Sequence, residues 1–122
     1  MAVSTIISPV NSLVFIHGPR GWQSPLPVDG QLIWSTASCV ATACFPEVEG
    51  PTKIILGLAA EVDPGGAPAF VGTLETPHKI VTITAVADDR PLLSHDVPGA
   101  MTPIRIWHSH PRWPDVVTVG LG

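Results

Sequence analysis

The sequence is poor in charged residues. Asp, Glu, Lys and Arg make up 13% of its 122 residues, against about 25% in an average soluble domain. The formal net charge is −4, and the basic residues are scattered without forming a stripe, so we expect no nucleic-acid partner. The basic residues are Arg20, Lys53, Lys79, Arg90, Arg105 and Arg112.

The sequence also lacks a long apolar run. None approaches the roughly 18 residues that a transmembrane helix needs, so we expect no membrane partner. The segment Met1–Pro9 has no positively charged part before its apolar residues, which argues against a signal peptide and favours a cytoplasmic location. Hydrophobic residues nevertheless make up 45% of the chain. Either a compact β-protein with threonine-rich faces or a homo-oligomer that covers apolar surface would explain this composition.

Cysteine is scarce. Cys39 and Cys44 lie five positions apart, without the Cys-x-x-Cys spacing that is typical of zinc or redox sites. On one strand they would point to opposite faces. We therefore expect two small buried hydrophobic residues in a reducing compartment.

Long helical periods are absent, because 14 prolines and 11 glycines interrupt the whole chain. Strand-like runs lie between them at intervals of roughly 8–12 residues, which is typical of a β-sandwich. We predict an all-β fold, a single antiparallel, jelly-roll-like sandwich domain over residues 1–122. The expected strands are Val3–Ser8, Ser12–His17, Gln31–Ser35, Cys39–Phe45, Thr52–Val62, Ala69–Thr76, His78–Ala87, Leu92–Val97, Met101–Ser109 and Asp115–Leu121.

Two segments depart from the simple pattern of short strands. Thr52–Val62 is either one long strand or a strand with a helix at Leu56–Glu61, against which Gly57 argues. Gly18–Gly30 holds three prolines and three glycines and is predicted to be a long surface loop, with Trp22 turned inward.

Common catalytic motifs are missing. The chain has neither a Gly-x-Ser-x-Gly nucleophile elbow nor a Gly-x-x-x-x-Gly-Lys phosphate loop. Glu47 and Glu49 are two apart at an expected turn, where paired carboxylates are more often solvated than catalytic. An enzyme is therefore the less favoured interpretation.

The stretch Trp107–Asp115 is the segment with the clearest chemistry. On a strand His108 and His110 share one side, and two imidazoles at this spacing can bind one zinc or iron ion. The chain would then be a small metal-dependent hydrolase or isomerase. The alternative is that both rings bond backbone or water at the end of the strand, with no cofactor. A third ligand would come from His17, His78, His95, Glu47, Glu61 or Asp115.

The string His108-Ser109-His110-Pro111 resembles the core of the JAMM metalloprotease signature. The downstream serine and aspartate that complete that family's zinc site are missing, although Asp115 could take the aspartate's place. That family also packs helices against its sheet, and we expect none here. We therefore reject this assignment.

The same stretch is also a candidate binding surface. Trp107 and Trp113 flank a turn with two prolines, and Arg105 and Arg112 lie beside them. Tryptophan and arginine are enriched at protein–protein hot spots. The alternative is that both indoles cap the end of the sandwich core.

Taken from end to end, the order of features resembles the competence protein J (DNA-entry nuclease inhibitor) family. The likeness lies in Ser8–Phe15, in the strand–turn–strand Ala41–Leu58, and in Val81–Trp107 with its Arg90-Pro91-Leu92 and Val97-Pro98-Gly99. It is one of pattern, so no functional residue is carried over, and the tryptophan–proline tail departs from it. The resemblance implies a β-sandwich that binds another protein. We therefore expect a non-enzymatic, inhibitor-like interaction module, and the apolar composition adds the expectation that it self-associates.

Overall fold

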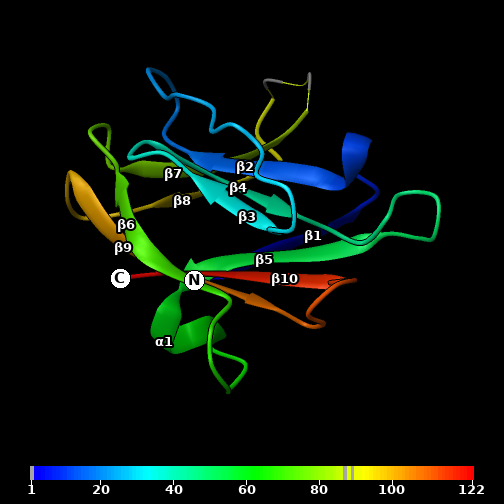
Figure 1. Ribbon diagram of the computed structural model, residues 1–122. Coiled ribbons are helices and arrows are strands. Elements are labelled where there is room, and N and C mark those ends of the chain that lie inside the picture. Colours follow the sequence, from blue (N-terminus) through cyan, green and yellow to red (C-terminus); the bar gives the residue numbers. More distant parts are fainter. Residues whose placement is uncertain (1, 87, 89) are drawn as a thin grey trace.

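Ten strands in two five-stranded sheets make up most of the computed structural model, which describes residues 2–86, 88 and 90–122 (Figure 1). The first sheet has the order β1-β5-β10-β9-β6, and the second has the order β3-β4-β2-β7-β8. The strands of the first sheet are β1 (Val3–Ile7), β5 (Thr52–Leu58), β6 (Phe70–Glu75), β9 (Met101–His108) and β10 (Val116–Leu121). Those of the second are β2 (Leu13–His17), β3 (Ile33–Ser35), β4 (Cys39–Ala43), β7 (Ile80–Ala85) and β8 (Leu93–Asp96).

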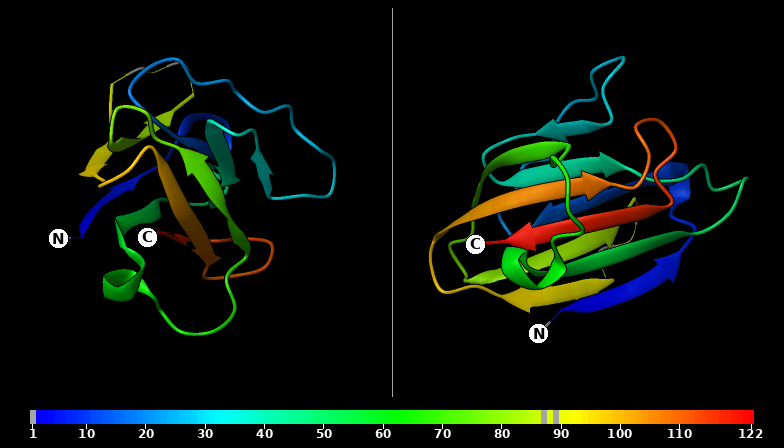
Figure 2. Two further views of the ribbon diagram at one scale, coloured as in Figure 1. Left: turned by 90° about the vertical axis from the view of Figure 1, so that its left-hand side faces the viewer. Right: turned by 90° about the horizontal axis from the view of Figure 1, so that it is seen from below.

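The core lies between the two sheets, because strands of both contribute to one buried apolar cluster. Alternation along each strand selects its members: Ile104 and Ile106 of β9 point inward, as do Val81 and Ile83 of β7. The views in Figure 2 show the two layers stacked on each other. The all-β prediction is confirmed.

One strand pair differs from the predicted antiparallel arrangement. β10 pairs in parallel with β5, with Val116 opposite Lys53 and Leu121 opposite Leu58, whereas its other neighbour β9 is antiparallel. The whole segment from α1 (Ala59–Val62) to β9 separates β5 from β10 in the chain, and a parallel pair requires such a long connection. Residue alternation sets which face a side chain occupies and not which strand lies beside it, so the sequence pattern could not show this.

The predicted strands all occur, with small changes at their ends. The long segment Thr52–Val62 divides into β5 and the short helix α1, so each of the two alternatives holds in part. A 3-10 turn, η1 (Val10–Ser12), was not predicted; it occupies the expected break between β1 and β2. The end of the strand predicted at His78–Ala87 and the expected turn at 88–91 include Ala87 and Asp89, which lie outside the described residues. Neither helix of the described chain is long and apolar enough to cross a membrane.

The short helix α1 and the segment after it cover part of the outer face of the first sheet. The indole of Trp107 packs there beside α1, and its Nε1–H donates to the carbonyl of Gly66 at 3.3 Å. Gly120 of β10 makes this packing possible, since a Cβ at this position would lie 2.8 Å from the Trp107 ring and 3.0 Å from the Cα of Ala59. Figure 1 shows α1 below this sheet, on the side away from the second sheet.

Candidate functional site

The stretch Trp107–Asp115 forms the end of β9, a tight turn and the residue before β10. Ile104, Ile106 and His108 follow one another on the core side of β9, while Arg105 and Trp107 lie on its outer side. This part of the alternation is as the sequence predicts. The strand ends at His108, so the alternation does not extend to His110.

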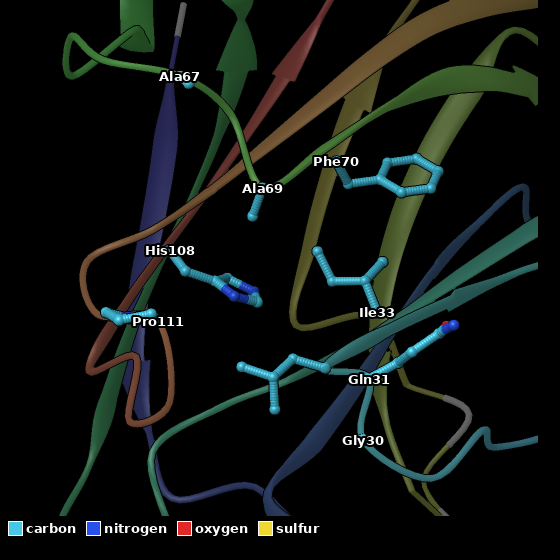
Figure 3. Close-up of a pocket in the computed structure, with 9 residues that line it drawn as sticks. Gly30, Gln31, Ile33, Ala67, Ala69, Phe70, His108 and Pro111 are labelled. Carbon is cyan, nitrogen blue, oxygen red and sulfur yellow. The ribbon is translucent and has the colours of Figure 1, made fainter.

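His108 bridges the two sheets at the end of the core. Its Nε2 lies 2.7 Å from Oγ1 of Thr42 on β4, and burial lowers the pKa of its imidazole below the ordinary value of 6.5. Figure 3 shows the ring pointing into a cleft of about 590 Å³, toward the side chains of Ile33 and Phe70. This cleft opens between the edge strands β3 and β6, so His108 lies at an accessible edge of the sandwich.

His110 is exposed and supports the turn instead of facing the cleft. Its Nδ1 accepts hydrogen bonds from the backbone N–H groups of Arg112, at 3.1 Å, and Trp113, at 3.0 Å. Because Nδ1 accepts these two bonds, its lone pair is not free to bind a metal ion. For His110 this arrangement matches the alternative in which both rings bond backbone or water, whereas His108 bonds the side chain of Thr42.

A third metal ligand is also missing from the described part of the chain. Within residues 2–86, 88 and 90–122, no three His, Cys, Asp or Glu side chains converge closely enough to hold a metal ion. Asp115, one of the expected third ligands, accepts a hydrogen bond from Ser109 Oγ at 2.7 Å. The geometry thus gives the zinc or iron hypothesis no support beyond the spacing of the two histidines.

The turn after β9 is held by a dense set of local bonds. Besides the two bonds to His110, the backbone N–H of Val116 donates to Ser109 Oγ at 3.0 Å, and that of Ser109 donates to the carbonyl of Val116 at 3.1 Å. Pro111 and the buried Pro114 fix two further φ angles. The turn is therefore preorganised, and a partner that contacts it need not supply the free energy to order it.

The prediction that Trp107 belongs to an exposed contact surface is wrong. Its indole is 5% exposed, because it lies under the α1 layer with its N–H bonded to Gly66. Arg105 is exposed on the same outer face of β9, several residues before the turn, whereas Arg112 is exposed within it. The four residues proposed as one surface are thus divided between a sheet face and a turn.

Trp113 is 55% exposed, in agreement with the exposed-contact alternative for this residue. Together with Phe45, Pro46 and Glu49 it lines a surface pocket of about 480 Å³, which we call the Trp113 patch. Val48, at the tip of the same loop, is 89% exposed. The patch therefore combines an accessible indole, further apolar surface and a carboxylate at one end of the sandwich.

Three members of the Trp113 patch were not predicted as site residues. The turn that contains Glu49 was expected, but nothing in the sequence connects it with Trp113, which lies 64 positions further along the chain. Only the strand order brings the two turns to the same end of the molecule. The nearest signal in the sequence was the exposed turn Glu47-Val48-Glu49-Gly50 itself.

A third pocket, of about 490 Å³, lies on the outer face of the second sheet. Trp22 turns inward as predicted and stacks on His17, with ring centroids 3.9 Å apart and planes at 12°. His17 Nε2 lies 2.8 Å from Thr84 Oγ1, and burial lowers the pKa of this imidazole more than its bond to the Gly18 carbonyl raises it. The stack closes the floor of this pocket and fixes the start of the long loop.

Neither cysteine is placed for chemistry. Cys39 and Cys44 are buried free thiols, and burial raises the pKa of each to about 12. A nucleophilic cysteine needs the opposite shift. The prediction of two small buried hydrophobic residues is confirmed for their burial.

Comparison with solved structures finds a similar fold. The chain is similar to ComJ, the inhibitor of the DNA degrading activity of NucA from Bacillus subtilis, with a TM-score of 0.65 and 10% sequence identity. The match covers 98% of this chain and 93% of that one. No protein-family model matches the sequence, and no curated protein matches it significantly. The predicted resemblance to the competence protein J family is thus confirmed at the level of fold.

Proposed function

We propose, from the fold shared with ComJ, that this chain is a non-enzymatic protein that binds a nuclease and inhibits it. The observation that carries the proposal is the length of the match, which spans 98% of this chain and 93% of ComJ. ComJ inhibits the DNA degrading activity of NucA. A fold can host several functions, so the surface chemistry has to support the same conclusion.

The turn after β9 supplies the contact surface in this proposal. It presents Trp113 and Arg112 to solvent on a backbone held by His110 and two prolines. Exposed tryptophan on a preorganised turn is typical of a binding hot spot. The net charge of −4 suits a partner whose own surface is basic, as the DNA-binding surface of a nuclease is.

We also propose that the chain self-associates through β1. This strand pairs with β5 on one side and forms the edge of its sheet on the other. Its sequence, Val-Ser-Thr-Ile-Ile, has neither charge nor proline, the usual devices that protect an edge from pairing. Ile6 is 66% exposed, so a second copy would bury apolar surface as well as pair backbone groups.

A cytoplasmic location belongs to the same proposal. Both cysteines are free, as is usual in a compartment that keeps thiols reduced. Inhibition of a nuclease inside the cell would protect DNA there.

A DNA-degradation assay tests the proposed function. Purified NucA would degrade linear duplex DNA alone, with an equimolar amount of this chain, and with the same amount of heat-unfolded chain. We expect the folded chain to slow degradation and the unfolded chain to have no effect. A tight one-to-one complex needs only equimolar amounts. Unchanged degradation at about a tenfold excess of the folded chain would therefore refute the nuclease assignment.

A further inference from the structure

The Trp113 patch has a chemistry that favours one kind of side chain. It is lined by Trp113, Phe45, Pro46 and Glu49, and both Trp113 and Glu49 are exposed, so an indole and a carboxylate are available to a partner. The negative face of an indole attracts a cation, and a carboxylate pairs with one. An anion would be repelled by the carboxylate, whereas a cation on an apolar stem matches both the carboxylate and the apolar side chains that line the pocket.

We propose that the Trp113 patch binds an arginine side chain that projects from a basic partner protein. The planar guanidinium can stack on an indole and direct its N–H groups to a carboxylate at the same time, which the ammonium of lysine cannot do. The aliphatic stem of the arginine would lie against Phe45 and Pro46. This proposal rests on the proposed function for the kind of partner, but its chemistry can be tested without any nuclease.

The loop that carries Glu49 is fixed in place, as such a site requires. The carbonyl of Pro46 accepts hydrogen bonds from the backbone N–H groups of Glu49, at 2.9 Å, and Gly50, at 3.2 Å. The loop is tied to η1 as well, since the backbone N–H of Glu47 donates to Ser12 Oγ at 2.9 Å. Both sides of the patch are thus preorganised, and binding needs little ordering of the protein.

Charged residues close to the patch in the chain include Glu47, Arg112 and Asp115. Glu47 is on the same loop as Glu49, and one of its carboxylate oxygens accepts a bond from the backbone N–H of Asn11 at 3.2 Å. Arg112 precedes Trp113 in the turn and is exposed. Glu47 therefore adds to the attraction for a cation, whereas Arg112 opposes it.

The test uses short peptides as probes. A hexa-arginine peptide, a hexa-lysine peptide and an uncharged hexa-citrulline peptide are added to the ¹⁵N-labelled full chain, and the indole N–H signal of Trp113 is followed by NMR. We expect hexa-arginine to shift this signal, hexa-lysine to bind at least about threefold more weakly, and hexa-citrulline to cause no shift. Equal binding of the arginine and lysine peptides would overturn the assignment to arginine.

Variants localise the binding. Trp113→Ala has no indole at this position, so binding to it is followed by the backbone N–H signal of Glu49; this variant should weaken hexa-arginine binding at least about fivefold, and Glu49→Gln about threefold. Arg112→Gln should strengthen it about twofold, because it removes a like charge. The matched control is Glu75→Gln, which removes an exposed carboxylate of β6 at the opposite end of the sheet and should change binding by less than about 1.5-fold. Equal losses in Glu49→Gln and Glu75→Gln would show general charge attraction and overturn the site.

The outcome is separable from that of the nuclease assay. If NucA is inhibited equally well by Glu49→Gln and Trp113→Ala, the inhibitor proposal stands and the arginine site is refuted. If hexa-arginine binds with the expected variant pattern but NucA is unaffected, the site stands and the nuclease assignment fails.

Discussion

Two tryptophans six positions apart have opposite environments. Trp107 is 5% exposed and bonded through its indole N–H, whereas Trp113 is 55% exposed at the tip of a turn. Replacing Trp107 by Ala should lower the free energy of unfolding by roughly 3–5 kcal/mol, the usual cost of removing a buried tryptophan. Trp113→Ala should change it by less than about 0.5 kcal/mol, as at other surface positions. Urea unfolding measures both, and similar losses in the two variants would contradict the assigned environments.

Two histidines make the stability depend on pH. Burial lowers the pKa of both His17 and His108 below 6.5, so their folded forms bind a proton less readily than the unfolded chain does. Stability is therefore fully present above about pH 6.5 and decreases as the pH falls from there toward the folded pKa values. We expect less stability at pH 5.5 than at pH 7.5 in urea unfolding, and imidazole NMR midpoints below 6.5. Equal stability at the two pH values would show that neither ring is held neutral by the fold.

The positions of the strands in the chain were easier to predict than the strands with which they pair. The threonines and apolar residues of β7 exchange sides at period two, and this local pattern marks a strand wherever it lies in the fold. The parallel pairing of β10 with β5 depends instead on contacts between residues more than 50 positions apart, which leave no local pattern. The burial of five of the six residues of β10 is the physical sign of its central position, but an apolar run alone does not identify the adjacent strand.

For the candidate site, the turn itself could be predicted from the sequence, but the contacts that its residues make could not. The composition of Trp107–Asp115 singled out the turn, and its prolines indicated a rigid backbone. The role of His110 as an acceptor for two backbone N–H groups depends on where the strand ends, which was expected at Ser109 and occurs at His108. The contribution of Phe45, Pro46 and Glu49 depends on the strand order.

The contact between α1 and the first sheet gives a prediction for β10. A methyl group added at Gly120 would lie 2.8 Å from the Trp107 ring and 3.0 Å from the backbone of Ala59, so Gly120→Ala should lower stability by roughly 1–3 kcal/mol. Gly99→Ala is the matched control, since its nearest neighbours would be 3.6 and 3.9 Å away. Thermal unfolding of the two variants should separate them clearly. A Gly120→Ala protein as stable as Gly99→Ala would mean that α1 does not lie on β10.

At the scale of the whole molecule, we propose that two or more copies of the chain associate. Multi-angle light scattering at micromolar concentration should give a mass above the 12.8 kDa of one chain. Ile6→Lys would place a charge on the exposed edge of β1 and should return the mass to that of one chain. A single-chain mass for the unmodified protein would remove the self-association proposal.

Metal analysis tests the remaining enzymatic alternative. We expect the purified protein to carry less than stoichiometric zinc and iron, and chelator treatment to leave its melting temperature unchanged. Stoichiometric metal that is lost in His108→Ala would instead favour the metal-dependent hydrolase or isomerase.

The central claim is that this sandwich binds a nuclease through the end that carries Trp113. An NMR map of the ¹⁵N-labelled chain in complex with NucA tests it directly, because each backbone and indole N–H reports its own surroundings. We expect the largest signal changes on the turn around Trp113 and the loop around Glu49, and unchanged signals for Glu75 and Met101 at the opposite end. Changes centred on the opposite end, or none at a twofold excess of NucA, about enough to saturate a tight complex, would contradict it.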